Sequence, residues 1–331
     1  MIKDILGISP GITVVIGSGG KTTLIGKLAE EISSEMQEFS DRNNIGAGGN
    51  NNVENDNDVN TSAATGKTTG NTAENTTGNT IGTPGIIICT TTHIMRPDNM
   101  PVFAPEIYGR GGEEPAIAHA LETFLRENAG HPVCVGFPDP DNPAKLVSFP
   151  IETIKQAAGE NAYILVEADG AKHLPLKAHK ENEPVIPGDS TKVILVVGAE
   201  GFGRPIAEVV HRPEIFAKLG GADVDAIVTP EIFAKVFKAE QGKFGDHPLQ
   251  IFMNCRNERT IDRLEPCADQ GENETEAGSV KEITLNKCLR YAEEITLNKC
   301  LRYAEEIARL TGVEVYAGCA GSGTAIRCNA G

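Results

Sequence analysis

The chain has 331 residues, enough for one large α/β domain or for one domain with a small addition, and it can bury a substantial core. Its formal net charge of -16 at pH 7 disfavours broad binding to nucleic acid or to anionic membrane surfaces, so an anion has to be held by a local site. The amino terminus lacks a basic segment followed by a long apolar run, and no later run is long enough to span a bilayer. We therefore expect a cytoplasmic protein with neither a membrane nor a nucleic acid as partner.

Short apolar runs bounded by Gly, Pro or polar residues are typical of buried strands. Such runs occur at Ile12–Ile16, Gly85–Thr91, Pro132–Gly136, Ala162–Asp169, Lys192–Ala199, Asp225–Pro230 and Pro248–Asn254. Segments with helical periodicity lie between several of them, most clearly at Thr22–Met36, Glu114–Asn128 and Pro230–Glu240. This alternation predicts a three-layer α/β fold, in which helices flank a mostly parallel sheet.

Two segments depart from this pattern. Residues 41–83 are rich in Asn, Thr, Gly and Asp and contain almost no large apolar residue, which predicts a disordered insertion. Near the other end, the twelve residues EITLNKCLRYAE at Glu282–Glu293 are repeated at Glu294–Glu305. One duplication is too short for a repeat array, so we interpret it as a recent copy without its own function. The predicted units are an α/β domain at 1–40 and 84–279 and a helical segment with a final strand at 280–331.

The eight cysteines contain no C-x-x-C pair of the kind found in zinc ribbons and redox motifs. Several of them lie in apolar runs, which is typical of reduced thiols in a core.

A glycine-rich loop follows the first predicted strand and precedes the first predicted helix. This loop, called the glycine loop below, consists of Gly17, Ser18, Gly19, Gly20, Lys21, Thr22 and Thr23. A strand, glycine loop and helix in this order form the setting of a P-loop, in which main-chain N–H groups surround phosphate oxygens. We expect Lys21 to contact the β- and γ-phosphates of ATP or GTP and Thr22 to bind Mg²⁺. Val15 stands where the standard spacing has glycine, so the loop is of a shorter type, like that of Mur-type ligases.

Two carboxylates end the apolar run Ala162–Val166, where a P-loop protein presents its second acidic motif. Glu167 and Asp169 are two positions apart and share one face of an ideal strand. One is expected to join the Mg²⁺ shell and the other to orient a water or an acceptor. We place the metal at Thr22 and Asp169 and regard Lys21, Glu167 and Asp169 as catalytic candidates, although the sequence leaves the roles of the two carboxylates open.

Further polar residues follow predicted strand ends. Thr92 and His93 come after the run at Ile86–Cys89, where open α/β sheets bind ligands, although a solvated turn explains them equally well. Lys172 and Lys177 follow Asp169 and are candidates for contacting an anionic substrate, although exposed lysines are usually only solvated. A fourth cluster, His211-Arg212-Pro213-Glu214, is interpreted as the cap of a helix at Ile215–Leu219.

Four motifs together resemble YqeC-type proteins. They are GSGGKTT at Gly17–Thr23, TTTHI at Thr90–Ile94, VEADGAKHLPLKAHKENEPVIP at Val166–Pro187 and HRPE at His211–Glu214. The resemblance implies a nucleotide-dependent accessory factor for a selenium-dependent molybdenum hydroxylase or for its cofactor. Relatives often carry Asn-Lys where this chain has Asn254-Cys255-Arg256, which leaves the choice between ATP and GTP open.

Two uses of a nucleotide are compatible with these residues. The first is a Mg²⁺-dependent enzyme, an NTPase, transferase or ligase, in the biosynthesis of a selenium-containing molybdenum cofactor or in hydroxylase maturation. The second is a nucleotide-dependent switch or chaperone that delivers the cofactor to a client hydroxylase. A scaffold with a simple phosphate pocket is a third interpretation, and it predicts no dependence on Mg²⁺.

Overall fold

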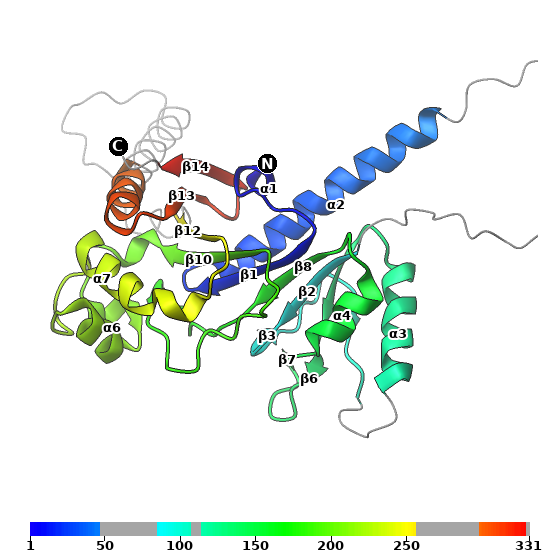
Figure 1. Ribbon diagram of the computed structural model, residues 1–331, viewed down its shortest axis with the longest axis horizontal. Coiled ribbons are helices and arrows are strands. Elements are labelled where there is room, and N and C mark those ends of the chain that lie inside the picture. Colours follow the sequence, from blue (N-terminus) through cyan, green and yellow to red (C-terminus); the bar gives the residue numbers. More distant parts are fainter. Residues whose placement is uncertain (47–84, 107–113, 256–297, 329–331) are drawn as a thin grey trace, which may run out of the picture.

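The computed structural model describes residues 1–46, 85–106, 114–255 and 298–328 (Figure 1). Most of the predicted insertion and the first copy of the tandem repeat lie outside these ranges. The helices are α1 (Ile2–Ile5), α2 (Lys21–Gly46), α3 (Glu114–Glu127), α4 (Ile151–Ala158), α5 (Ile206–Val209), α6 (Pro213–Gly220), α7 (Pro230–Glu240) and a further helix described over 298–311. Short 3-10 turns cover Ala199–Gly201 and Gln241–Phe244.

A nine-stranded sheet forms the centre of the molecule. In spatial order its strands are β14 (Thr324–Cys328), β13 (Glu314–Cys319), β12 (Leu249–Asn254), β10 (Lys192–Gly198), β1 (Gly11–Gly17), β8 (Tyr163–Glu167), β2 (Ile86–Thr90), β5 (Pro132–Val135) and β4 (Val102–Phe103). All neighbours pair in parallel except β13 and β14. Two small sheets are added, β3 (His93–Met95) with β7 (Lys145–Val147) and β6 (Phe137–Pro138), and β9 (Leu176–Lys177) with β11 (Val210–His211).

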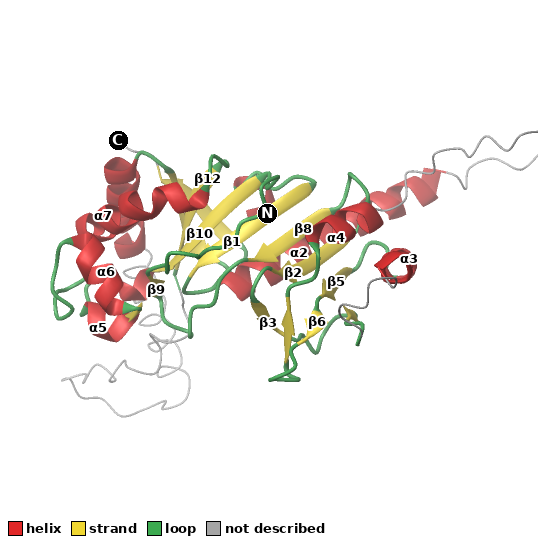
Figure 2. Cartoon of the chain, turned by 60° about the horizontal axis from the view of Figure 1, so that its bottom comes forward, coloured by secondary structure: helices red, strands yellow, loops and turns green. Residues whose placement is uncertain are grey.

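Helices cover both faces of the large sheet. Successive residues of β1 point to opposite faces, so Val15 packs with α2 while Val14 and Ile16 join a second cluster that includes Phe233 of α7. In Figures 1 and 2, α6 and α7 gather at one end of the sheet and α3 and α4 at the other. Two buried faces explain why the strands are apolar along their whole length. The predicted three-layer α/β arrangement with a mostly parallel sheet is therefore confirmed.

One predicted strand is wrong. Asp225–Pro230 forms no strand of the sheet, because β10 pairs directly with β12 and leaves no position between them. Only Ile227 makes an isolated bridge, to Pro205, and the segment leads into α7, whose first turn is capped by the Thr229 side chain. At the carboxyl end, two strands, β13 and β14, occupy the place of the single final strand that was expected.

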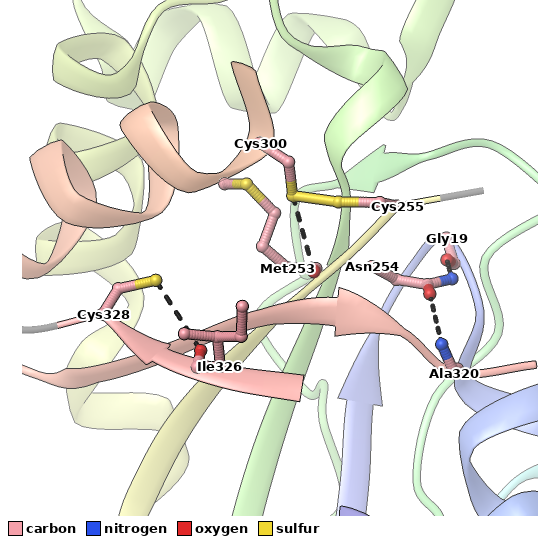
Figure 3. Close-up of a disulfide and its surroundings, with 8 residues drawn as sticks. All are labelled: Gly19, Met253, Asn254, Cys255, Cys300, Ala320, Ile326 and Cys328. Carbon is pink, nitrogen blue, oxygen red and sulfur yellow. Dashed lines mark hydrogen bonds between the residues drawn. A yellow bond between two sulfur atoms is a disulfide. The ribbon is translucent and has the colours of Figure 1, made fainter. Parts of the chain in front are cut away.

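The cysteines only partly follow the expectation of reduced thiols. Cys89 and Cys134 are buried and free, and burial raises the pKa of the Cys134 thiol to about 12. In contrast, Cys255 and Cys300 form a disulfide that joins the residue after β12 to the helix at 298–311 (Figure 3). The two cysteines are 45 positions apart, so no local spacing indicated the bond.

Among the described helices, none combines the length and the apolar character that crossing a bilayer requires.

Candidate functional site

The register of the sheet brings the glycine loop and the predicted carboxylates to one edge. Val15 of β1 lies opposite Glu167 of β8, and Gly17 lies opposite Val196 of β10. Because these strands are parallel, their carboxyl ends meet at the same side, where open α/β sheets bind ligands. Asp169 follows two residues after the end of β8.

The loop needs its glycines. Gly17, Gly19 and Gly20 have φ angles of 90°, 86° and 137°, which side chains rarely tolerate. A Cβ atom on Gly17 would stand 2.3 Å from the carbonyl oxygen of Val196, and one on Gly20 would stand 2.2 Å from Asn254 Nδ2. The loop is therefore packed closely against β10 and the end of β12.

Asn254 fixes the loop from the side of β12. Its buried Nδ2 donates to the carbonyl oxygen of Gly19 at 2.7 Å, and its Oδ1 accepts from the N–H of Ala320 at 3.0 Å (Figure 3). Sequence reasoning treated Asn254 only as a departure from a base-recognition motif. The structure gives it a clear role in positioning the glycine loop.

The main-chain N–H groups of the loop divide into two sets. The N–H of Gly17 donates to Asp169 Oδ2 at 2.8 Å, and that of Ser18 donates to the carbonyl oxygen of Val196 at 2.8 Å. The next five N–H groups, from Gly19 to Thr23, donate no hydrogen bond to another described residue; the regular helical pattern starts at Leu24. Consecutive free N–H groups at the start of a long helix carry partial positive charge and form an anion-binding concavity.

Lys21 and Thr22 reach the two carboxylates differently. The buried Lys21 Nζ lies 2.9 Å from the carbonyl oxygen of Gly17, 3.1 Å from Asp169 Oδ1 and 3.6 Å from Glu167 Oε1. The exposed Thr22 donates its hydroxyl to Glu167 Oε2 at 3.0 Å. Thr22 and Asp169 were predicted to bind the metal together. In the structure, Thr22 contacts Glu167, whereas Asp169 forms an ion pair with Lys21.

Asp169 is the centre of a buried ion network. Lys21 contacts its Oδ1, and its Oδ2 contacts the Gly17 N–H, Lys177 Nζ at 3.0 Å and His179 Nε2 at 2.9 Å. The other ring nitrogen of His179 lies 2.8 Å from Glu240 Oε2 of α7. His179 and Glu240 were not anticipated, because they are 61 positions apart and only the fold shows that they touch. His179 itself, two residues after Lys177 in the most specific motif, was the one available signal.

The pKa values of the two carboxylates move in opposite directions. Burial alone would raise the pKa of Asp169, but the hydrogen bond from His179 and the charges of Lys21 and Lys177 hold it well below its usual range. Burial raises the pKa of Glu167, and Lys21 and Thr22 only partly oppose this. For His179, burial lowers the pKa, but hydrogen bonds to Asp169 and Glu240 outweigh it and raise the pKa overall. The charge of Asp169 is thus balanced by neighbouring cations, whereas burial is the larger influence on Glu167.

Thr92 and His93 are placed less closely. The Thr90 hydroxyl donates to the carbonyl oxygen of Glu167 at 2.6 Å and accepts from the Thr92 N–H at 3.0 Å, so Thr92 stays near the end of β8. His93 is exposed on β3, and its Nε2 lies 3.7 Å from Asp139. No contact within the described ranges joins His93 to the glycine loop.

The segment after Asp169 lies against the glycine loop. Ser18 donates its hydroxyl to the carbonyl oxygen of Leu174, and Lys177 Nζ donates to that of Gly170 at 2.7 Å. Of the two predicted substrate lysines, Lys177 is therefore buried in the ion network and Lys172 is exposed.

A small cavity lies behind the loop, lined in part by Gly17, Ser18, Lys177, His179 and Glu240, and it has a volume of about 10 Å³. This is room for roughly one water molecule. This cavity is too small for a nucleotide, and the free N–H groups and Thr22 lie on the outer side of the loop.

The sequence profile of the YqeC protein family matches residues 64–214, which include Glu167, Asp169 and Lys177 but not the glycine loop. The protein named "Uncharacterized protein YqeC" from Escherichia coli (strain K12) is 32% identical over 187 residues, which cover 55% of this chain and 66% of that relative, slightly less than two thirds of its length. No solved structure matches. The family match and the relative together support a YqeC-type protein.

Proposed function

We propose that this protein binds ATP or GTP together with Mg²⁺ at the glycine loop and uses the nucleotide in an enzymatic step, as an NTPase, transferase or ligase. One observation carries the proposal. The five free N–H groups of Gly19 to Thr23 lie at the start of the 26-residue α2, beside the ammonium group of Lys21. In a chain with a net charge of -16, such a concentration of positive potential indicates an anion as ligand.

The residues present fit a triphosphate. The N–H groups would surround phosphate oxygens, and the glycines provide a main chain without Cβ atoms on that side of the loop. Lys21 has three N–H donors, but only Gly17 and Asp169 lie within hydrogen-bond distance; the contact to Glu167 is longer, at 3.6 Å. One donor of Lys21 therefore remains for a phosphate.

Thr22 and Glu167 are the residues that would hold Mg²⁺. In the described ranges, no three His, Cys, Asp or Glu side chains are grouped to bind a metal ion. Mg²⁺ does not need such a group, because it usually takes one or two protein ligands and completes its shell with phosphate oxygens and waters. When bound, Mg²⁺ neutralises the charge of the phosphates. The position of Glu167 supports this role, since its Oε2 accepts from the Thr22 hydroxyl at 3.0 Å and its Oε1 lies 3.6 Å from Lys21 Nζ.

Asp169 is proposed to act through Lys21. It is fully buried and contacts three cationic side chains, so it orients Lys21 toward the loop rather than facing the outer side. We propose maturation of a selenium-dependent molybdenum hydroxylase, or of its cofactor, as the biological setting. This part of the proposal is supported by the sequence resemblance alone.

The test is the affinity of the full chain for ATP and GTP, measured by calorimetry with and without Mg²⁺. Lys21→Ala is expected to weaken binding about tenfold to a hundredfold, since one charge-assisted hydrogen bond to phosphate, worth about 1.5–3 kcal/mol, is lost. Lys180→Ala is the matched control, because Lys180 is exposed and makes no side-chain contact with a described residue. Equal affinity in Lys21→Ala and the parent would remove the glycine loop as the site.

Lys21 is part of the ion network, so its replacement can also disturb folding. Thr22→Val keeps the test informative, because Thr22 is exposed and contacts only Glu167 through its hydroxyl. We expect Thr22→Val to bind nucleotide in the absence of Mg²⁺ like the parent and to lose the gain that Mg²⁺ provides. An unchanged response to Mg²⁺ would contradict the metal assignment.

A further inference from the structure

Three residues other than glycine have a left-handed main-chain conformation in the described ranges. They are Lys172 (φ 47°), His173 (φ 60°) and Arg212 (φ 69°). This conformation costs a residue with a Cβ atom about 1–2 kcal/mol, so the surrounding structure has to enforce it. Lys172 and His173 are the central residues of one turn, closed by a hydrogen bond from the Leu174 N–H to the carbonyl oxygen of Ala171 at 3.2 Å.

The three residues lie at one place in the fold. Strand β9 follows the Lys172–His173 turn and β11 precedes Arg212, and the two strands pair in parallel with Lys177 opposite His211. Arg212 Nη1 donates to the carbonyl oxygen of Ala178 at 3.0 Å, which fixes the start of α6 against the same segment.

This place adjoins the glycine loop. The turn is anchored on one side by Lys177, which donates to the carbonyl oxygen of Gly170, and on the other by Ser18, which donates to that of Leu174. The N–H of Gly198, at the end of β10, donates to the carbonyl oxygen of Pro175 at 2.8 Å. The contacts that enforce the strained turn therefore come from the elements that position the glycine loop.

The cations at this place are unequally matched. Lys177 is paired with Asp169 at 3.0 Å, and Arg212 is paired with both carboxylate oxygens of Glu183, at 2.6 and 2.8 Å. By contrast, the side chains of Lys172, His173 and His211 make no hydrogen bond or ion pair with any residue of the described ranges. The first two are exposed and His211 is half-buried.

The environment of His211 is strongly cationic. Burial and the charges of Arg212, Lys177 and Lys172 lower the pKa of His211 to about 4, and the charge of Glu183 opposes this shift. Lys177 is paired with Asp169 and Glu183, and Arg212 with Glu183, so Lys172 is the cation near His211 that has no carboxylate partner in the described ranges.

We propose that Lys172, His173 and His211 bind the oxyanion group, carboxylate or phosphate, of a second substrate that lies beside the nucleotide. This inference rests on the proposed function, because it names the chemical class of the substrate that would react with the nucleotide. The strained turn of Lys172 and His173 is attached to the glycine loop by the hydrogen bond from Ser18 to Leu174, and His211, uncharged at neutral pH, supplies a hydrogen-bonding ring nitrogen.

The test follows the imidazole proton resonances of the full chain by NMR during titration with inorganic phosphate and, separately, with acetate. The chain has seven histidines, and His211→Gln and His173→Gln assign the two resonances of interest. We expect a saturable shift of the His211 resonance with at least one of the two anions. The bound anion should also raise the pKa of His211, because it opposes the surrounding positive charge.

Matched variants locate the anion. Lys172→Gln is expected to weaken its binding roughly tenfold, as one charge-assisted contact is lost, whereas Lys180→Gln should leave it unchanged. The titration is repeated in Lys21→Ala or, should that variant not fold, in the parent saturated with a non-hydrolysable nucleotide analogue. A shift that persists there supports the site at the turn, and a shift that disappears assigns the anion to the glycine loop and overturns the proposal.

The proposal is also overturned when neither anion gives a saturable shift of His211, or when Lys172→Gln and Lys180→Gln behave alike. Its failure can be distinguished from failure of the proposed function. Phosphate binding at His211 without nucleotide binding would support this site and contradict the proposed function. Nucleotide binding without phosphate binding at His211 would support the proposed function and contradict this site.

Discussion

The two sides of the glycine loop differ in how fully their charges are matched. On the inner side, the Gly17 N–H, Lys21, Lys177 and His179 all contact Asp169, and His179 continues the network to Glu240. On the outer side, the N–H groups of Gly19 to Thr23 have no partner in the described ranges, and Glu167 is paired there with one cation, Lys21, at 3.6 Å. A matched buried network supports a structure, whereas unmatched groups at a strand end are placed for a ligand. The comparison assigns support to the inner side and binding to the outer side.

The largest expected effect is that of Asp169→Asn on stability. Removing the inner carboxylate charge leaves three buried cationic groups without their shared partner, which should lower the free energy of unfolding by about 3–5 kcal/mol. Glu167→Gln is the matched variant on the outer side. Because the fold already raises the pKa of Glu167, loss of its charge should cost less than about 1 kcal/mol. Urea unfolding measures both, and similar losses would contradict the assignment of the two sides.

The next effect concerns the attachment of the last helix. Cys300→Ser removes the disulfide to Cys255, which closes a loop of 45 positions, and should lower the free energy of unfolding by about 2–4 kcal/mol. Cys255 follows Asn254, which binds Gly19, so the loss is expected to loosen the outer side more than the Asp169 network. A reducing agent should destabilise the parent to a similar extent and leave Cys300→Ser unaffected. A parent insensitive to the reducing agent would contradict the bond.

The inner side also predicts a dependence of stability on pH. The fold raises the pKa of His179, so its protonation stabilises the folded state fully below the unfolded value, near pH 6.5, and this contribution is lost as pH rises through the higher folded pKa. His179→Gln should remove this decline. Urea unfolding at a series of pH values from 6 upward, roughly the start of this window, measures it. His119→Gln, at an exposed position, is the control and should keep the slope of the parent.

The sequence predicted what depends on local pattern. The apolar run at Ile12–Ile16 became β1 at Gly11–Gly17, and the helical periodicity at Pro230–Glu240 became α7 with the same bounds. The glycine loop was found for the same reason, since its residues are contiguous. The strand predicted at Asp225–Pro230 was wrong. A short apolar run joins a sheet only where a neighbouring strand has a free edge, and β10 and β12 already pair with each other.

The rest of the site depends on contacts between distant segments. His179 and Glu240, Asn254 and Gly19, and Cys255 and Cys300 are each joined only by the fold. The division of roles between Glu167 and Asp169 could not be predicted either, because an ideal strand places both on one face. The chain leaves β8 at Glu167, which lets Asp169 turn under the loop while Glu167 stays beside Thr22.

The smallest expected effect separates strain from binding at the Lys172–His173 turn. Lys172→Gly removes a left-handed residue with a Cβ atom, a gain of about 1–2 kcal/mol, and adds the chain entropy of glycine in the unfolded state, a loss of about 0.5–1 kcal/mol. The free energy of unfolding should therefore rise by up to about 1.5 kcal/mol, while phosphate binding at His211 weakens because the ammonium group is gone. Lys180→Gly, at an exposed position without a positive φ, should instead lose about 0.5–1 kcal/mol and keep phosphate binding. A turn that gains stability and loses its ligand in the same substitution is strained for the sake of binding. Were Lys172→Gly to destabilise the chain as much as Lys180→Gly does, the left-handed conformation at Lys172 would carry no strain, and the outer side would lose that argument for its second ligand.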